Sequence, residues 1–182
     1  MFSLPAQHQL KKGSLLTTLQ SLGQTWRISF QFYPSNYNSK GWTSLLHLTT
    51  GGDLRTYGER TPAIFFHPSY GMVTASAING NPNYWKSLNI QIPLSQWSTI
   101  VLSQEKSDGV VTFRIVVNGT EAWSVVNTQP KEFKSVKVYA SDPWYEAQPG
   151  YIRALTIQTT GTRRCQLMNL YASFFFSTLF SV

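Results

Sequence analysis

The chain has little cysteine and little charge. One cysteine among 182 residues excludes an internal disulfide, so cysteine usage assigns no redox compartment. Charged residues make up 13% of the chain, against about 25% in typical globular domains. Ser, Thr, Asn, Gln and Tyr must therefore cover much of the surface. Such a surface is common on extracellular β-proteins, and it favours an extracellular or cell-surface location.

Residues that perform catalysis are also scarce. A glycosidase needs two carboxyl groups about 5 Å apart to retain configuration, or about 6.5–9.5 Å apart to invert it. The eight acidic residues fall in predicted loops or at strand ends, and no two lie at positions i and i+2 of one strand. The three histidines have no close spacing, so no zinc site is predicted. The sequence predicts a protein that is not an enzyme, and a glycan-active hydrolase is the third alternative.

The charge balance is basic, with 15 Lys and Arg residues against 8 Asp and Glu residues. A net charge of +7 would attract polyanions, among them sulfated glycans. The basic residues are scattered, however, and no run exceeds two residues. Because no zinc-finger, RNP-like or recognition-helix pattern is present, nucleic acid is not a predicted partner. A sulfated polyanion remains an alternative partner.

Short apolar segments alternate with polar residues along most of the chain and end at Gly, Pro or Asn. Trp26, Ile28, Phe30 and Phe32 show this period-two pattern, which is typical of a strand with one buried face. Residues 97–103 are apolar on both sides, which indicates a central strand with Trp97 in the core. We therefore predict an all-β fold, an antiparallel sandwich of two sheets.

Two Asn-Gly pairs predict tight hairpins, at residues 79–80 and 118–119. With a two-residue loop at the second pair, Val117 faces Thr120 and Arg114 faces Trp123. The latter pair would then form a cation–π contact. Residues 118–120 also form an N-glycosylation sequon, which we interpret as a turn.

The pattern divides the chain into an N-terminal lead of residues 1–12, a sandwich of residues 13–160 and a hydrophobic tail of residues 161–182. The lead has no apolar segment of a secretory signal. The uncharged run of residues 167–182 is shorter than the roughly 20 residues of a spanning helix. Residues 163–182 leave three interpretations open, which are membrane contact, a packed terminal strand and a tail unrelated to the sandwich.

Several segments carry a resemblance to a known superfamily. They are Gly23–Phe30, Gln96–Ile100, the hairpin Ile115–Gly119, Val136–Tyr139 and Ile152–Ile157. Together with a final strand that matches the first strand at 13–20, these segments resemble the concanavalin A-like jelly roll over residues 13–159. This superfamily includes laminin-G-like, pentraxin-like and legume-lectin-like domains. The resemblance implies ligand binding on a sheet face or rim loops, often of glycans and sometimes through calcium.

The chain departs from the catalytic and sugar-binding motifs of this superfamily. The Glu-x-Asp-x-x-Glu strand motif of its glucanases is absent, which puts hydrolysis in doubt. Galectins carry Trp-x-x-Glu-x-Arg in the sugar site, whereas the segment Trp85–Leu88 lacks the acid. The resemblance therefore implies the fold and a binding role without identifying the ligand.

Aromatic residues in predicted loops, with polar residues among them, form the candidate binding site. Sugar rings stack their C–H faces on aromatic rings, and their hydroxyls need hydrogen-bonding partners. The candidate ligand-binding residues are Arg60, Tyr70, Asn83, Tyr84, Trp85, Asp142, Trp144 and Tyr145. The alternative for each ring is that it caps an end of the sandwich.

Asp53 and Asp142 are the candidate calcium ligands, because calcium accepts carboxylate and backbone oxygens from separate loops. The alternative is that each side chain stabilises its own turn. No other cofactor is predicted. The sequence as a whole favours a non-catalytic module that binds a carbohydrate or glycoprotein surface. The rival prediction is a structural or adhesive protein-interaction module of a larger extracellular protein.

Overall fold

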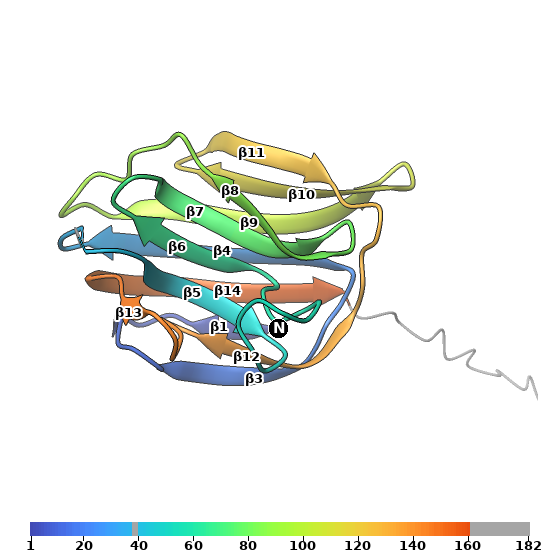
Figure 1. Cartoon of the computed structure of the whole chain (residues 1–182), viewed down its shortest axis with the longest axis horizontal. Helices are drawn as coiled ribbons and strands as arrows, with labels where there is room; N and C mark the ends of the chain where they lie inside the picture. Colours follow the sequence, from blue (N-terminus) through green and yellow to red (C-terminus); the bar gives the residue numbers. More distant parts are fainter. Residues whose placement is uncertain (38–39, 161–182) are drawn as a thin grey trace, which may run out of the picture.

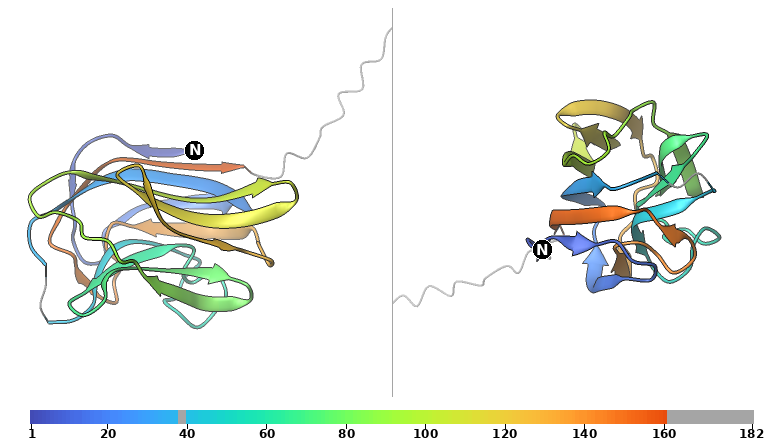
Figure 2. Two further views of the ribbon diagram at one scale, coloured as in Figure 1. Left: turned by 90° about the horizontal axis from the view of Figure 1, so that it is seen from above. Right: turned by 90° about the vertical axis from the view of Figure 1, so that its left-hand side faces the viewer.

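The computed structural model describes residues 1–37 and 40–160. The chain forms a sandwich of two seven-stranded sheets, and all of its longer strands pair antiparallel. The two sheets are stacked face to face (Figures 1 and 2). The all-β, two-sheet prediction is confirmed. The predicted hydrophobic tail, residues 161–182, lies outside the described residues.

Each sheet draws strands from distant parts of the chain. Sheet A has the order β1 (Phe2–Leu4), β14 (Gly150–Thr160), β4 (Thr25–Pro34), β9 (Ser98–Ser107), β10 (Val110–Val117) and β11 (Thr120–Val126), and β2 (His8–Gln9) also pairs with β14. Sheet B has the order β3 (Leu15–Leu22), β12 (Phe133–Tyr139), β5 (Thr43–Thr49), β6 (Ala63–His67), β7 (Gly71–Ile78) and β8 (Asn81–Ser87), and β13 (Glu146–Ala147) pairs with β5. Figure 1 shows sheet B in front of sheet A.

The core lies between the sheets, where the period-two pattern of the sequence places it. The predicted inward residues of β4, Ile28, Phe30 and Phe32, are at most 1% exposed. Each such side chain contributes about 1.5–3 kcal/mol by its burial. Strand β9 lies between β4 and β10, so it is central as predicted. Trp97 is a correction, because it precedes β9 on the outer face and is only half-buried.

Both predicted Asn-Gly hairpins form, and Asp108-Gly109 makes a third at the turn from β9 to β10. Asn118 has a φ of 48° and Gly119 a φ of 84°, as a type I′ turn requires. The predicted pair Val117 and Thr120 is present.

The register of the β10–β11 hairpin differs from the prediction beyond its first two pairs. A β-bulge between residues 115 and 116 leaves Ala122 without a partner, so Arg114 faces Ser124 instead of Trp123. The Arg114 guanidinium lies 3.5 Å from a carboxylate oxygen of Glu121. The predicted pairing of Arg114 with Trp123 is therefore wrong, because one extra residue turns the rest of β11 over.

The N-terminal residues join sheet A. Strands β1 and β2, which the sequence pattern does not predict, pair with the closing strand β14. Strand β3 pairs with β12 in the other sheet. In the described part of the chain no helix has the length and apolarity needed to cross a membrane.

Candidate functional site

The outer face of sheet B carries a second, smaller hydrophobic cluster. Ala63, Phe65, Val73 and Ala75 are at most 2% exposed, and Tyr145 packs against them. These residues belong to β6 and β7, whose other face contributes to the core. Both faces of these strands therefore carry apolar residues, and Arg60 and Tyr145 pack against Phe65 on the outer face.

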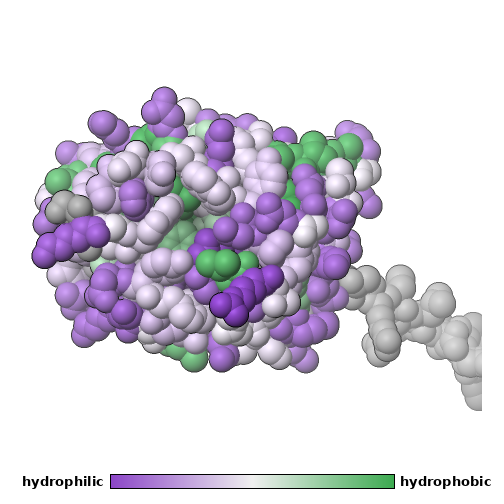
Figure 3. Space-filling model, viewed as in Figure 1, coloured by the Kyte–Doolittle hydropathy of each residue, from purple (hydrophilic) through white to green (hydrophobic). Residues whose placement is uncertain are grey.

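A cavity of about 210 Å³ opens beside this cluster. It is lined by Trp42, Leu54, Arg60, Phe65, Val73, Asn83, Trp85 and Tyr145. Figure 3 shows this face of the molecule, with hydrophobic surface set among paler and hydrophilic side chains near its centre. An apolar floor with a few polar groups suits a small ligand that has both apolar and polar edges.

Exposed aromatic rings form one wall of the cavity. Trp42 and Trp85 are 36% and 50% exposed, and both line the cavity. Tyr70 lies between them, with its ring centroid 5.9 Å from that of Trp42 and 5.8 Å from that of Trp85. The His67 ring stacks on Tyr70 at 4.7 Å. Such rings expose faces on which a sugar can stack.

Arg60 forms the polar side of the cavity, and its hydrogen bonds are satisfied within the protein. Its Nε and Nη2 atoms donate to Asp53 Oδ1 at 3.1 and 2.8 Å, and its Nη1 atom donates to Asn83 Oδ1 at 2.7 Å. The guanidinium also lies 4.6 Å from the centroid of the Phe65 ring. Because Asp53 neutralises this buried cation, the cavity presents dipoles rather than a free positive charge.

Tyr145 connects this ion pair to the cavity. Its hydroxyl donates to Asp53 Oδ2 at 3.0 Å and accepts a hydrogen bond from Arg60 Nη2 at 3.2 Å. Burial and the negative charge of Asp53 raise the pKa of Tyr145, so its phenol stays protonated at neutral pH. Asn83 has its amide nitrogen left to donate, since its oxygen accepts from Arg60. A ligand hydroxyl would therefore meet an amide donor and a phenol.

A fully buried pair, His47 and Asp142, holds the loops that carry these residues. Asp142 accepts hydrogen bonds from His47 Nδ1 at 2.9 Å and from the backbone N–H groups of Trp144 and Tyr145 at 3.0 and 2.9 Å. The other ring nitrogen of His47 lies 2.7 Å from the carbonyl oxygen of Glu59. Both ring nitrogens face oxygen acceptors, and each can donate a hydrogen bond only in a ring that carries two protons.

The structure brings together some of the predicted ligand-binding residues and separates others. Arg60, Asn83, Trp85 and Tyr145 line one cavity, and Tyr70 adjoins it. Three other predicted residues, Tyr84, Asp142 and Trp144, do not line it.

Each of these three has a different position. Tyr84 lies on the opposite side of β8 from Trp85 and stacks on Trp123 at 6.0 Å. The carboxylate of Asp142 is fully buried with His47. Trp144 is 39% exposed and packs on His47 and Tyr139.

Trp42, Phe65 and His67 complete the site and were not among the predicted residues. Trp42 directly precedes β5, and Phe65 and His67 lie on β6. The alternation of side chains along β6 could have predicted them. Phe65 and His67 share one face of the strand, whereas Phe66 points to the core.

The two candidate calcium ligands lie in different hydrogen-bond networks. Asp53 is bound to Arg60 and Tyr145, and Asp142 to His47 and backbone N–H groups. Within residues 1–37 and 40–160, no three His, Cys, Asp or Glu side chains gather as a metal site would require. Calcium binding by Asp53 or Asp142 stays a prediction.

A larger cavity, of about 680 Å³, opens at one end of the sandwich. Its lining includes the buried residues Phe66, Met72 and Ile92 and the more exposed aliphatic residues Ile90 and Leu94. The hydroxyl of Tyr37 in this cavity already donates to the backbone carbonyl of Ile92. The cavity is larger and its lining also contains the polar residues His67 and Gln91, but no tryptophan lines it. The sheet B site, with two exposed tryptophans, is therefore the better candidate for a sugar.

Comparison with known proteins identifies the fold. No known protein family and no curated protein matches the sequence. Among solved structures, the chain is similar to a SAP-like pentraxin from Limulus polyphemus (TM-score 0.55, 15% identity, 85% of this chain and 73% of that one). It is also similar to the CBM40 of the Ruminococcus gnavus IT-sialidase bound to α2,3-sialyllactose (TM-score 0.55, 15% identity, 86% and 94% of the two chains).

A third similar structure is domain 4 of an extracellular arabinanase from Geobacillus stearothermophilus in complex with arabinotriose (TM-score 0.51, 18% identity, 79% and 64% of the two chains). At these identities the similarity establishes the concanavalin A-like jelly-roll fold alone. The resemblance inferred from the sequence is confirmed at that level.

Proposed function

We propose that the protein is a non-catalytic glycan-binding module whose ligand occupies the cavity on the outer face of sheet B. The observation that carries this proposal is the gathering of exposed Trp42, Tyr70 and Trp85 around a cavity that also contains Asn83 and Tyr145. Two of the similar structures contain a bound oligosaccharide, sialyllactose or arabinotriose. An extracellular or cell-surface location belongs to the same proposal.

The electrostatics of the cavity favour an uncharged sugar. Arg60 is the cation of the lining, and its terminal nitrogens already donate to Asp53, Asn83 and Tyr145. An acidic sugar would compete with Asp53 for the guanidinium and bring a second negative charge next to the first. A neutral sugar avoids this repulsion, because it needs only the rings and the polar groups of Asn83 and Tyr145.

The lining of the cavity supports binding without hydrolysis. None of its eight residues is an Asp, Glu, Ser, Cys or His. Glycoside hydrolysis ordinarily requires a pair of carboxyl groups flanking the bond to be cleaved. The nearest carboxylate in the hydrogen-bond network, Asp53, is paired with Arg60.

A glycan array probed with the full chain, in calcium and in a chelator, tests the proposal. We expect saturable binding of neutral oligosaccharides, weakened at least tenfold by Trp85→Ala or Trp42→Ala. Loss of one stacking ring removes apolar burial and its specific geometry, together about 1.5–3 kcal/mol. Trp144→Ala is the matched control, since that exposed tryptophan lies outside the cavity.

Each outcome of this experiment separates the alternatives. If Trp144→Ala abolishes binding and Trp85→Ala does not, the ligand lies on the other side of His47 and the proposed site is wrong. Binding that disappears in chelator would assign a role to calcium. If no glycan binds in either condition, the structural or adhesive module becomes the better explanation.

A further inference from the structure

The outer face of sheet A carries a row of three aromatic rings on three neighbouring strands. Tyr151 of β14 is the register partner of Tyr33 of β4, and the Tyr33 ring lies 5.4 Å from that of Trp97, just before β9. The rings of Tyr33 and Tyr151 are 6.2 Å apart. Their sequence neighbours Phe32 and Ile152 are fully buried between the sheets, so the three rings face outward.

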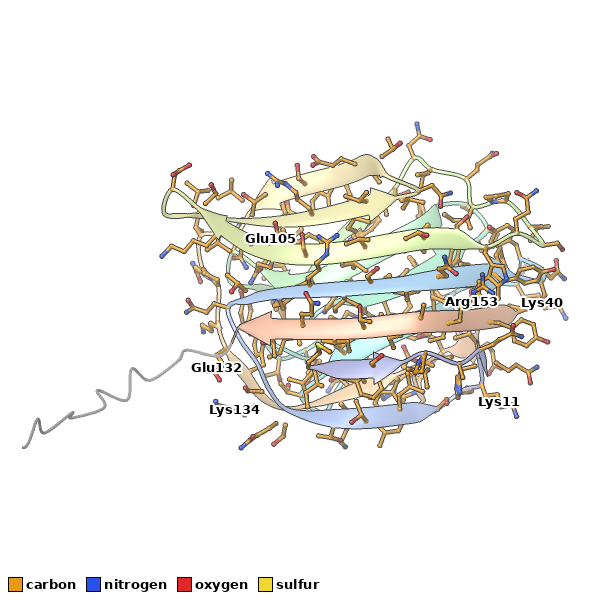
Figure 4. All side chains as sticks on the ribbon, turned by 180° about the vertical axis from the view of Figure 1, so that it is seen from behind. Lys11, Lys40, Glu105, Glu132, Lys134 and Arg153 are labelled. Carbon is orange, nitrogen blue, oxygen red and sulfur yellow. The ribbon has the colours of Figure 1, made fainter. Side chains whose placement is uncertain are left out.

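Arg153 lies over this row. Its guanidinium carbon is 4.0 Å from the centroid of the Trp97 ring, and its Nε atom donates to Gln31 Oε1 at 2.7 Å. Figure 4 shows Arg153 on this face, far along the sheet from Glu105. The ring and the amide fix the plane of the guanidinium, which limits the entropy that a ligand would have to remove.

Arg153 differs from the other arginines of the described chain by its lack of an acidic partner. Arg27, Arg60 and Arg114 each form an ion pair with a carboxylate, and Arg55 lies near the charge of Glu59. Within residues 1–37 and 40–160, the two terminal nitrogens of Arg153 have no acceptor. An oriented guanidinium with free terminal N–H groups can bind a carboxylate with two parallel hydrogen bonds.

We propose that Arg153, Trp97, Tyr33 and Tyr151 form a second binding site, and that its ligand is a carboxylated sugar. The rings stack on the apolar face of the sugar, and the terminal N–H groups of Arg153 bind the carboxylate that the same sugar carries. This site is independent of the cavity on sheet B, because it lies on the opposite face of the sandwich.

The site formed by Arg153 and the three rings fits a sugar with one acidic group better than a densely sulfated chain. The patch offers one unpaired guanidinium and three rings, whereas a highly sulfated chain requires several cations in a row. The guanidinium fork also matches the two oxygens of a planar carboxylate. The site therefore selects a sugar acid with one carboxylate next to its ring.

Calorimetry and NMR on the full chain test this site with a tetramer of galacturonic acid as the probe. Its methyl ester is the matched control ligand, because esterification removes the charge and keeps the sugar ring. We expect saturable binding of the acid, with shifts of the Arg153 Nε–H and Trp97 indole N–H signals, and at least tenfold weaker binding of the ester. Arg153→Gln should weaken binding at least tenfold, and Arg153→Lys should restore it only in part. Trp85→Ala should leave this binding unchanged.

Three results would overturn the proposal. One is that the acid and its methyl ester bind equally, and another is that Trp85→Ala abolishes binding while Arg153→Gln does not. The third is that a keratan sulfate tetrasaccharide, which carries sulfate but no carboxylate, shifts the Arg153 and Trp97 signals while the galacturonate does not. Failure here with intact neutral-glycan binding would leave the sheet B site unaffected.

Discussion

Removing the carboxylate of Asp142 should show how much its buried pair with His47 contributes to the free energy of unfolding. From its two oxygen acceptors we infer that the His47 ring is doubly protonated. Asp142→Ala then leaves this ring fully buried without a counterion, and it leaves the N–H groups of Trp144 and Tyr145 without their acceptor. Breaking a buried pair in this way costs about 3–5 kcal/mol. Since a domain has about 5–15 kcal/mol of stability in total, the variant should be severely destabilised.

Asp142→Asn should cost less, about 1–2 kcal/mol, because an amide can replace part of the network. Its oxygen can accept the two backbone hydrogen bonds, and its NH₂ group can donate to Nδ1 of His47. The ring must then be neutral, with its remaining proton on Nε2 and directed at the carbonyl of Glu59. The substitution should therefore change the protonation state of His47 without removing its hydrogen bonds.

Two measurements check this reasoning. Urea unfolding followed by circular dichroism should place Asp142→Asn between the wild type and Asp142→Ala in stability. The ring ¹⁵N signals of His47 at neutral pH should show two protonated nitrogens in the wild type and one in Asp142→Asn. A neutral His47 ring in the wild type, or a cost below about 1 kcal/mol for Asp142→Ala, would refute the assignment of a buried charged pair.

The same pair gives a pH dependence of known sign. Burial alone would raise the pKa of Asp142, but the hydrogen bond and charge of His47, together with the hydrogen bonds of Tyr145 and Ser44, hold that pKa below the usual 3.8. The carboxylate therefore stabilises the fold fully above about pH 4, and this contribution is lost as the pH falls through the lowered pKa. The stability difference between the wild type and Asp142→Asn should shrink below that pH.

Two further predictions concern backbone geometry and the partly buried phenol of Tyr37. Gly150 has a φ of 151°, and a Cβ atom there would lie 2.2 Å from the carbonyl oxygen of Tyr33; Gly150→Ala should cost more than about 2 kcal/mol in urea unfolding. Gly109→Ala, where a Cβ atom meets nothing within 4 Å, should cost about 1 kcal/mol, and equal costs would contradict the clash. Burial raises the pKa of Tyr37 to about 12, so the wild type should lose stability between pH 10 and 12. Because the pKa values of Tyr57 and Tyr145 are also raised, Tyr37→Phe should reduce this loss without abolishing it. Absorbance titration should show a phenol ionising near pH 12 in the wild type that is missing in Tyr37→Phe.

Much of the fold follows from local sequence, because alternation and turn residues act over a few positions. Residues 26–32 bury every second side chain as the pattern predicts, and both Asn-Gly hairpins form. The N-terminal strands β1 and β2 were missed because they have three and two residues, too few for a period to show. Their pairing with β14 depends on contacts more than 140 positions away in the chain.

The site was predictable only where a residue's face could be inferred. Trp85 and Tyr145 reach the cavity, but Tyr84 cannot, because adjacent residues of a strand point to opposite faces. The prediction placed residues 81–84 in a loop, whereas they begin β8. Asp142 was predicted as a ligand-binding residue and a calcium ligand, but its carboxylate is fully buried and bonded to His47, 95 positions earlier in the chain.

The bulge at Ala122 also affects how the protein meets other copies of itself. Strand β11 is the last strand of sheet A, so one side of its backbone has no neighbouring strand. A flat outermost strand is a template for pairing with another chain and thus for aggregation. The extra residue increases the twist of β11 and interrupts its regular spacing of N–H and C=O groups. We therefore expect the bulge to reduce strand-to-strand association at this edge.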